Sequence, residues 1–387
     1  MNPATPYYRL SSFYLFYFGS LGAFVPYWSV YLTDLGYAPA QIGELIAVTM
    51  VTKVFAPYLW GWIADHTGRR LGIIRLATFG AALAFAAVMW RQDYLWLMVV
   101  MIVFSFFWHA ALPQFEACTF NHLGEHRARY SHIRLWGSVG FIVAVVGLGY
   151  WFESRPLADL PWIVTLLLGL IFVSTLWLRS AAEALHPDPA QSIARALRQP
   201  AVISLLLAGF LMQASHGPYY TFFSVYLEQH GYPRGSVGQF WAIGVIAEIG
   251  VFLVMHRLLP RFGAVRLFQL AILVTSVRWV LTATLVDSAP VLIFAQTLHA
   301  ASYGLYHASA IDLINRYFPG KLQGRGQALY ASLCFGVGHA VGSLGSGYLW
   351  TGLSPEGSYL VAAAIAALAV GVSLFGLSRA TIPPQSS

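Results

Sequence analysis

Long apolar segments alternate with short polar gaps along the whole chain. Twelve segments reach the roughly 20 mostly apolar residues that a helix needs to cross a bilayer. Because open backbone cannot face lipid, each segment is predicted to be a helix, and the chain an all-α membrane protein. The segments cover approximately residues 9–33, 40–64, 71–90, 94–121, 130–152, 160–179, 201–229, 236–256, 264–286, 289–316, 325–350 and 357–378.

The longest polar gap, Ser180–Pro200, separates six predicted helices from six. This position predicts two domains. The first is an N-terminal six-helix bundle at 1–180, and 181–200 is a cytoplasmic linker between the halves. The second is a C-terminal six-helix bundle at 201–387, which ends in a short cytoplasmic tail.

One stretch of sequence occurs twice. SVYLTDLGYAPAQIG at Ser29–Gly43 matches SVYLEQHGYPRGSVG at Ser224–Gly238 in seven of fifteen positions, at an offset of 195 residues. A shared composition of helix ends and loops is the alternative explanation. We interpret the match as a duplication of half the chain, which predicts two pseudo-symmetric bundles. The same offset makes Lys53 the counterpart of Glu248, and both lie in otherwise apolar segments.

Composition and charge support a membrane protein. Apolar residues make up 58% of the chain and charged residues only 10%, against about 25% charged in a typical soluble domain. The net charge of +7 does not form one patch, so nucleic acid is not expected as a partner. With the N-terminus inside, sixteen Lys and Arg fall on the inner side and only Arg91, Arg155 and Arg234 on the outer side. This asymmetry predicts cytoplasmic termini, and we expect a bacterial inner membrane.

The loop after the second predicted helix reads GWIADHTGRR. Its glycines permit a tight turn and close helix approach, and its carboxylate can pair with a nearby cation to hold one conformation. A plain positive-inside loop is the alternative. The loop resembles the signature loop of the major facilitator superfamily, which implies two six-helix bundles around a midplane site. The second half has Pro260 in place of the acid, so this latch is expected to be asymmetric. The predicted latch residues are Gly61, Asp65, Gly68, Arg69 and Arg70.

A narrower resemblance rests on charged residues within the predicted helices. Glu116, and Arg134 eighteen residues later, resemble the sugar-binding pair of lactose-permease-type proton symporters. The aromatic first helix and the Gln213, His216, Tyr220 run look more like the phenylpropionate permease group. Two residues depart from the lactose-permease pattern: Ser302 stands where that group has a proton-handling Glu, and Phe141 where it has a Trp. Positions that resemble a charged or His position of that group are Glu248, Arg278 and His299.

Charged and polar side chains at membrane depth usually face a cavity or a partner. The predicted substrate-binding residues are Lys53, Glu116, Arg134, Gln213, His216, Tyr220 and Arg278. The predicted proton-coupling residues are Glu116, Glu248, His299, His307 and Asp312. For each, a purely structural ion pair or interhelical hydrogen bond is the alternative.

Spacing and charge suggest how some of these residues meet. Gln213, His216 and Tyr220 have helical spacing on one predicted face, where Pro218 can kink the helix. His299, Tyr303 and His307, spaced by four, make another face. A direct Glu116–Arg134 pair is feasible. Arg278 needs an anion, for which Glu248 or Asp312 could serve.

Several function classes have no support in the sequence. There is no phosphate-binding GxxxxGK[ST] loop, no HExxH and no cysteine-rich metal set, so we expect no enzyme activity, no metal and no cofactor. We predict a monomeric secondary transporter that uses a proton gradient to import a small anionic or aromatic carboxylate solute, phenylpropionate-like. Its expected partners are that solute, protons and the lipid bilayer. The alternatives are a sugar or nucleoside proton symporter, a drug or metabolite exporter of the same fold, and a membrane enzyme or receptor.

Overall fold

The computed structural model describes residues 6–124, 126, 129–179 and 193–378, so most of the predicted linker lies outside the described residues. Within these ranges the chain consists of helices, turns and loops, without a strand. The first half comprises α1 (Tyr7–Asp34), α2 (Pro39–Thr67), α3 (Arg70–Ala86) with the short turn η1 (Ala87–Met89), α4 (Tyr94–Leu123), α5 (Tyr130–Ser154), η3 (Leu157–Asp159) and α6 (Leu160–Leu176).

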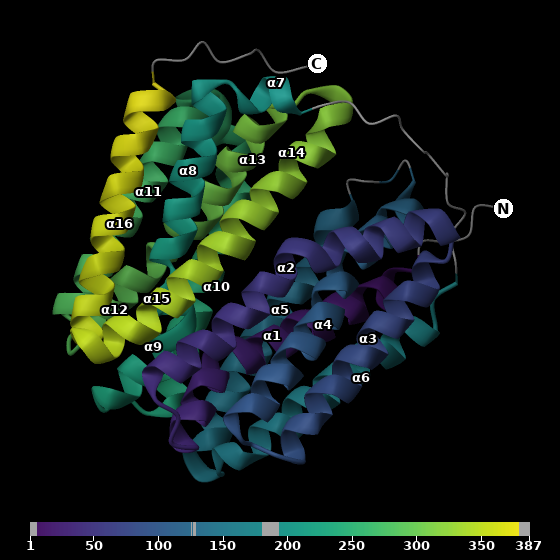
Figure 1. Ribbon diagram of the computed structural model, residues 1–387, viewed down its shortest axis with the longest axis vertical. Helices are drawn as coiled ribbons and strands as arrows, with labels where there is room; N and C mark the ends of the chain where they lie inside the picture. The colour runs from purple at the N-terminus through teal and green to yellow at the C-terminus, as the bar shows by residue number, and fades with distance from the viewer. Residues whose placement is uncertain (1–5, 125, 127–128, 180–192, 379–387) are drawn as a thin grey trace. The chain divides into compact units, whose positions relative to one another are not determined.

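The second half has more interrupted helices (Figure 1). Its elements are α7 (Ala194–Leu197), α8 (Pro200–Ser215), α9 (Gly217–Gln229), α10 (Arg234–Phe262), α11 (Ala264–Thr284), α12 (Ala289–Thr297), the π-helix η4 (Ala300–Leu305), α13 (Tyr306–Tyr317), η5 (Gly320–Leu322), α14 (Gln323–Tyr330), the π-helix η6 (Ala331–Gly338), α15 (His339–Gly352) and α16 (Pro355–Gly376).

These elements form the twelve predicted helical segments. Among the described residues, ten helical runs are long and apolar enough by length and composition to cross a membrane. α1 and the run 289–317 are not among the ten, because tyrosines and serines in α1 and histidines near η4 lower their hydropathy. The prediction of an all-α fold with twelve helices is confirmed, and two π-helices that it lacked are added.

The seventh segment is not one continuous helix. α8 ends and α9 begins at His216, with Gly217 and Pro218 opening α9. Proline has no backbone N–H to donate, and its ring disfavours a helical conformation in the preceding turn. The predicted kink at Pro218 is confirmed as a break at His216. The rings of His216 and Tyr220 still stack across it at 5.9 Å, as their spacing of four predicts.

By its contacts the chain divides into two compact units. Unit 1 consists of the described parts of Met1–Tyr37, Val51–Pro187 and Pro233–Gln239. Unit 2 consists of the described parts of Ala38–Met50, Asp188–Tyr232 and Phe240–Ser387.

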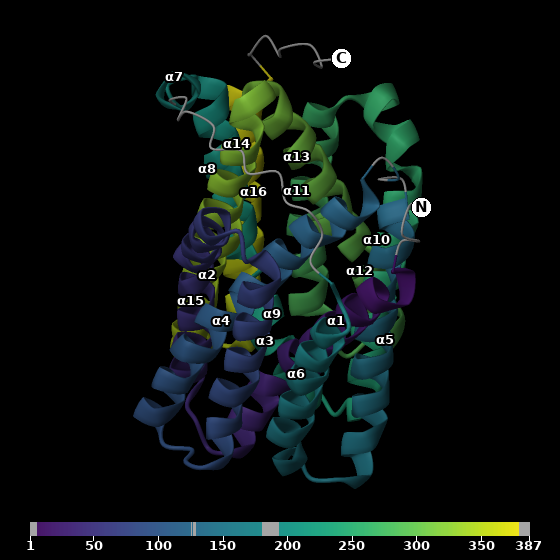
Figure 2. The ribbon, with the colours of Figure 1, turned by 90° about the vertical axis from the view of Figure 1, so that its right-hand side faces the viewer.

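Helix packing follows the same plan in both units. In unit 1, α1 packs on α5 and α6, and α3 packs on α4 and α6 (Figure 2). In unit 2, the α8–α9 segment packs on the α14–α15 segment and on α16, and α11 packs on the α12–α13 segment and on α16. Each pair in one unit has its counterpart six segments later in the other, as a duplicated bundle requires.

The two copies of the repeated stretch also share their backbone hydrogen bonds. Tyr37 N–H donates to Leu32 O at 3.1 Å, and Tyr232 N–H donates to Leu227 O at 3.1 Å. The glycine before each tyrosine has a positive φ, 85° at Gly36 and 78° at Gly231. This is a Schellman-type helix end, which favours glycine because it lacks Cβ. Local backbone geometry therefore supports the duplication read from the sequence.

The break before α9 packs against α15 at a distance that only glycine allows. A Cβ added to Gly217 would lie 2.1 Å from the Gly342 carbonyl oxygen. Gly217→Ala is therefore expected to lower the free energy of unfolding by about 3 kcal/mol, at the upper end of overpacking costs. The apparent melting temperature in detergent measures this. Gly345→Ala is the control, because nothing lies within 4 Å of its Cβ position. Equal melting temperatures for the two variants would contradict the prediction.

Candidate functional site

A buried arginine is the centre of a polar cluster in unit 2. Arg278 on α11 has no exposed surface. Its Nη1 donates to Ser302 Oγ at 2.8 Å and to His299 Nδ1 at 3.0 Å, and its Nη2 donates to Gln296 Oε1 at 3.1 Å. Its guanidinium carbon lies 4.3 Å from the Tyr219 ring centroid and 4.6 Å from that of Trp279. Neutral acceptors and aromatic faces therefore surround this cation.

This arrangement corrects the predicted partner of Arg278. Among the described residues no carboxylate contacts it directly. Glu248 Oε2 lies 3.7 Å from His299 Nε2, one residue removed from the guanidinium. Asp312 instead pairs with Arg316 at 2.7 Å, one helical turn along α13. Gln296, His299 and Ser302 supply the acceptors because they follow one another at steps of three along one side of the tenth segment.

The contact with Arg278 determines the tautomer of His299. A guanidinium has only donors, so His299 Nδ1 must act as the acceptor. The proton of the neutral ring then sits on Nε2 and points to Glu248. A second proton on Nδ1 would be repelled by the Arg278 N–H groups, because both groups would then be donors. The imidazole is thus held neutral, and it connects a buried cation to a partly buried carboxylate.

Ring stacking extends this cluster along the tenth segment. The rings of His299 and Tyr303 lie 5.6 Å apart with an interplanar angle of 15°, and those of Tyr303 and His307 lie 5.9 Å apart at 13°. This confirms the predicted face with a spacing of four. The first two rings flank or lie in the π-helix η4, a type of insertion that is frequent at functional sites.

His216 adds a second imidazole to unit 2. It is 1% exposed, its Nδ1 bonds to Met212 O at 2.8 Å, and its Nε2 has no hydrogen-bond partner among the residues that the structure describes. Its ring packs edge-on against Trp279 at 5.0 Å and stacks on Tyr220 at 5.9 Å. The break in the seventh segment therefore brings His216 and Tyr220 to the same aromatic wall as Arg278. Gln213 is also buried, one turn earlier on α8.

Unit 1 holds a separate polar chain next to Lys53. Thr52 donates to Ser105 Oγ at 2.8 Å, and Ser105 donates to Met101 O at 2.6 Å. Since the Thr52 proton is used, His109 Nδ1 must be the donor in its 3.1 Å contact with Thr52 Oγ1. His109 and His299 are thus opposite tautomers. Half-buried Lys53 is the residue after Thr52 on α2.

The predicted direct pair of Glu116 and Arg134 is not formed. Tyr130 donates to Glu116 Oε1 at 2.9 Å. The Arg134 guanidinium carbon lies 3.8 Å from the Phe18 ring centroid and 5.7 Å from that of Tyr14. Arg134 therefore packs on the aromatic face of α1, and Glu116 is held by a neutral phenol.

At the end of α2 the predicted latch residues come together. Arg70 Nη2 lies 2.6 Å from Asp65 Oδ1, and Arg70 also donates to Gln114 on α4. Gly68 has a φ of 62° in the turn before α3, and a Cβ at Gly61 would lie 3.3 Å from Gln114 Nε2. Arg69 is the residue just before α3. The loop thus ties α2, α3 and α4 together through Arg70.

Asp65→Asn is expected to lower the transport rate while changing the unfolding free energy by less than about 1 kcal/mol, the value of an exposed ion pair. Asp65 is 65% exposed, so its pair with Arg70 adds little stability. Uptake and melting temperature on the same preparation separate the two effects. Asp65→Glu keeps the charge and should restore most of the rate. A rate equal to the parent for Asp65→Asn would exclude the latch.

Sequence reasoning did not select two of the three residues that bind Arg278. Gln296 has no exposed surface and also accepts from Tyr219 at 3.1 Å. Ser302 was noted only as a departure from a family pattern. Their spacing of three on either side of His299 was the available signal. Within the described ranges, no group of three or more His, Cys, Asp or Glu side chains is placed to hold a metal ion.

Comparison with known proteins agrees with this architecture. A family model described as "MFS_1 like family" matches residues 7–361. A protein of Escherichia coli strain K12, named a probable 3-phenylpropionic acid transporter, is 29% identical over 364 residues, which is 91% of this chain and 93% of that protein. The maltose permease of Geobacillus stearothermophilus is 28% identical over 340 residues, 87% of this chain and 86% of the permease.

A solved structure has the same fold. The crystal structure of the nucleoside transporter NupG superposes with a TM-score of 0.82 at 16% identity, covering 97% of this chain and 99% of that one. At this level of identity the likeness concerns the fold alone.

Proposed function

Because this chain belongs to the MFS_1 like family, a family of major facilitator transporters, we propose that it is a proton-coupled symporter for a small aromatic carboxylate. The chain is a multi-pass secondary transporter of the major facilitator type that moves a small molecule, and it is not an enzyme. Our proposal adds the coupling ion and the substrate.

The observation that carries the proposal is the buried Arg278–His299–Glu248 chain in unit 2. A cation, a neutral imidazole and a carboxylate at membrane depth are typical of proton and substrate pathways. Protonation of Glu248 would change the net charge of this chain by one unit. Because Arg278 occupies Nδ1 of His299, we assign the proton to Glu248 and an orienting role to His299.

The substrate class rests on cations with aromatic neighbours. Lys53 and Arg134 are the candidates to bind a carboxylate, and Arg134 already lies over Phe18. The E. coli relative is named for 3-phenylpropionic acid, which has both a ring and a carboxylate. In unit 1, Glu116 is the second candidate for the proton.

The proposed setting of the protein is a bacterial inner membrane. We place both termini in the cytoplasm on the asymmetry of Lys and Arg. The membrane is proposed to be a bacterial inner membrane, as the organisms of the relatives suggest, and the working form a monomer. Candidates for the path of the proton between the site and the cytoplasm are His307, which stacks on Tyr303, and Asp312.

Sugar–proton symport is the second candidate function. It is supported by the maltose permease, which is nearly as similar as the first relative. Against it, Phe141 stands where the lactose-permease type carries a Trp that stacks on sugar. Uptake of labelled maltose with no uptake of phenylpropionate would favour this candidate.

Inverted or right-side-out vesicles that contain the protein provide the test. Labelled 3-phenylpropionate should accumulate when the outside is acidic, and the accumulation should collapse on addition of a protonophore. Vesicles without the protein are the control. If uptake of this substrate occurs but ignores the proton gradient, the coupling is excluded; if no uptake occurs, the substrate is excluded.

A further inference from the structure

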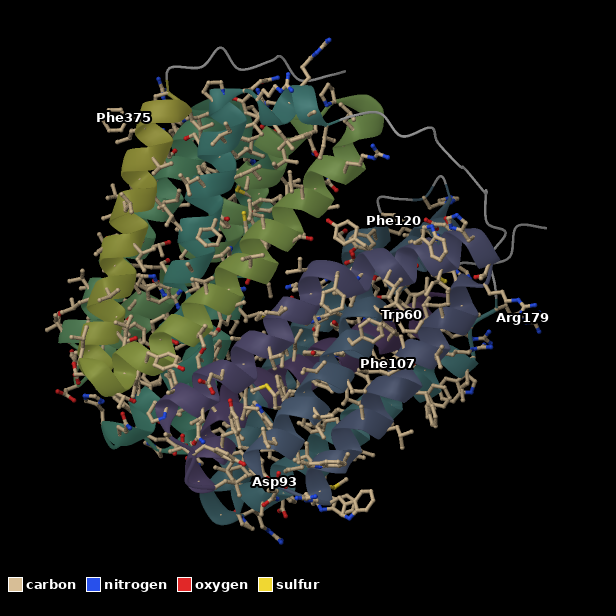
Figure 3. All side chains as sticks on the ribbon, viewed as in Figure 1. Trp60, Asp93, Phe107, Phe120, Arg179 and Phe375 are labelled. Carbon is tan, nitrogen blue, oxygen red and sulfur yellow. The ribbon has the colours of Figure 1, made fainter. Side chains whose placement is uncertain are left out.

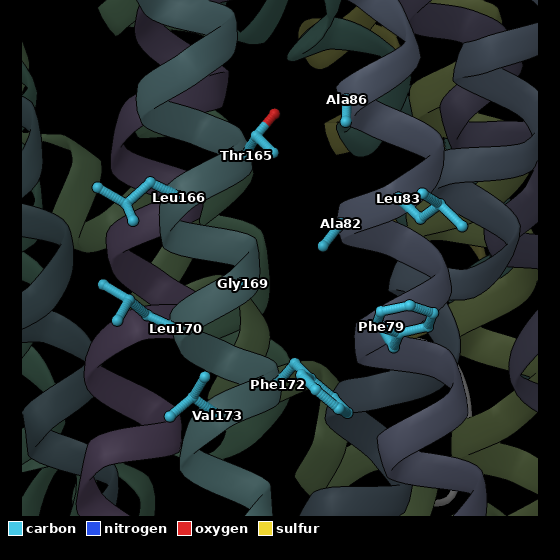
Figure 4. A pocket seen from close by; sticks show the side chains of 10 residues that line it. All are labelled: Phe79, Ala82, Leu83, Ala86, Thr165, Leu166, Gly169, Leu170, Phe172 and Val173. Atoms are coloured by element: carbon cyan, nitrogen blue, oxygen red, sulfur yellow. The ribbon is translucent and has the colours of Figure 1, made fainter.

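An apolar groove of about 470 Å³ lies between α3 and α6 in unit 1 (Figure 4). Small residues, Ala82, Ala86 and Gly169, hollow it out. Leu83 and Leu166 stand at its rims and are each 63% exposed. The one lining hydroxyl, Thr165, already donates to a backbone carbonyl of its own helix at 2.7 Å. The groove thus offers only hydrocarbon contacts, and both of its helices are membrane-spanning candidates.

Aromatic side chains from both helices line one end of the groove. The rings of Phe79 and Phe172 lie 5.3 Å apart. One turn beyond Phe79, Arg75 reaches from α3 to the end of α6, where its Nη2 donates to Leu178 O at 3.0 Å and to Thr175 O at 3.3 Å. A guanidinium therefore marks the boundary between the apolar groove and the helix end.

Two further arginines surround this end. Arg9 Nη1 donates to Trp177 O at 2.9 Å, and Arg179, labelled in Figure 3, follows directly after Leu178 and is exposed. None of the three arginines forms an ion pair with a carboxylate within the described part of the chain. The C-terminal dipole of α6 amounts to about half a negative charge, which is too little to neutralise three cations. Trp177 is 62% exposed beside them, as is typical of a membrane–water interface.

We propose that this surface is a binding site for one anionic phospholipid. The phosphodiester would lie at Arg9, Arg75 and Arg179, and one acyl chain would follow the groove past Gly169. The charge favours an anionic headgroup, since basic pockets at the ends of membrane helices attract anionic lipids. The almost entirely apolar lining favours hydrocarbon over a polar solute. The site is separate from the polar clusters above, so it does not depend on the proposed substrate or coupling.

Native mass spectrometry of the full chain in detergent tests the proposal. Dioleoylphosphatidylglycerol is expected to remain bound at one copy per chain, and dioleoylphosphatidylcholine to be lost at the same concentration. Arg179→Gln should weaken the apparent affinity about fivefold, the effect of one cation near an anionic headgroup. Gly169→Leu should abolish retention. No atom lies within 4 Å of a Cβ at this position, so the leucine fills the groove and displaces nothing.

Matched variants exclude general effects on folding or charge. Gly147→Leu adds a leucine at another open position, on α5, and Arg155→Gln removes an arginine that packs on Trp151. Both should retain the lipid like the parent. Glycerol 3-phosphate tests the headgroup alone, and monoolein tests the acyl chain without a phosphate. Neither compound should displace the phospholipid.

Three results would overturn the proposal. The first is equal retention of the two phospholipids. The second is full displacement by glycerol 3-phosphate, which would indicate a free phosphate site. The third is a dimer that Gly169→Leu dissociates, which would make the groove a contact between copies. Because lipid retention is measured without transport, failure here leaves the proposed symport untouched.

Discussion

Arg278→Met is expected to reduce transport by more than about 100-fold, since each charge-assisted hydrogen bond it loses contributes about 1.5–3 kcal/mol. The substitution removes donors from His299, Ser302 and Gln296, all of which are buried. It also frees Nδ1 of His299, so the imidazole can rotate or take a second proton. The connection to Glu248 would then lose its defined direction. Initial rates of uptake into vesicles at matched protein content measure the effect.

Two controls accompany this variant. Arg278→Lys keeps the charge but loses the planar fork that serves three acceptors, so an intermediate rate is expected. Arg266→Met removes an exposed arginine from the start of the same helix and should leave the rate unchanged. The melting temperature should fall for Arg278→Met, because buried acceptors are left unsatisfied. Transport by Arg278→Met within twofold of the parent would show that the buried cation has no part in the cycle.

Glu248→Gln is expected to abolish accumulation while leaving exchange of substrate across the membrane. The amide has nearly the same shape and can still accept from His299 Nε2, but it cannot gain or lose a proton at neutral pH. The ratio of internal to external substrate should therefore fall to about one, since a carrier without a coupled ion can only equilibrate its substrate. The steady-state ratio under an imposed pH gradient is the measurement, and labelled exchange confirms that the carrier still cycles.

A second variant separates the two candidate proton carriers in unit 2. His299→Asn retains an oxygen that can accept from Arg278 but has no titrating group. If Glu248 carries the proton, this variant should still accumulate substrate, at a lower rate. Glu356→Gln, on the exposed end of α16, is the matched control and should behave like the parent. Loss of accumulation in His299→Asn with normal accumulation in Glu248→Gln would reverse the assignment.

Much of the fold could be predicted from local sequence. Long apolar segments fix helix number, because a bilayer leaves the backbone no other way to satisfy its hydrogen bonds. Pro218 predicted the break in the seventh segment. The repeated stretch predicted a duplication, and Gly36 and Gly231 form the same helix end in both copies. Each of these features depends on residues close together in the chain.

The partners of the charged residues could not be predicted in the same way. Arg278 was expected to need an anion, yet Gln296, Ser302 and two aromatic rings surround it. Arg134 likewise packs on Phe18 rather than on Glu116. A carboxylate is not required when several neutral acceptors converge, and convergence depends on how helices are rotated against each other. That rotation is set by packing over whole helices, so no short stretch of sequence predicts it.

The two π-helices were also invisible in the sequence. The spacing of four from His299 to His307 fits an ordinary α-helix, and nothing in the residue types indicates an extra residue. A π-turn widens the backbone by one residue, and its stability depends on the packing around it. In η4 the neighbours include Glu248, whose Cγ would lie 3.4 Å from a Cβ at Gly304.

The extra residue in η4 can be regarded as an insertion that the helix has absorbed. Deleting one residue between Ala300 and Leu305 would restore a plain α-helix of nearly the same length. Because the bulge has absorbed the extra residue, the helix on either side of it would keep nearly its present orientation. Gln296 and His299 would stay at Arg278, and His307 would keep its place. Only the side chains between Ala300 and Leu305 would turn to new neighbours, among them Ser302, which accepts from Arg278.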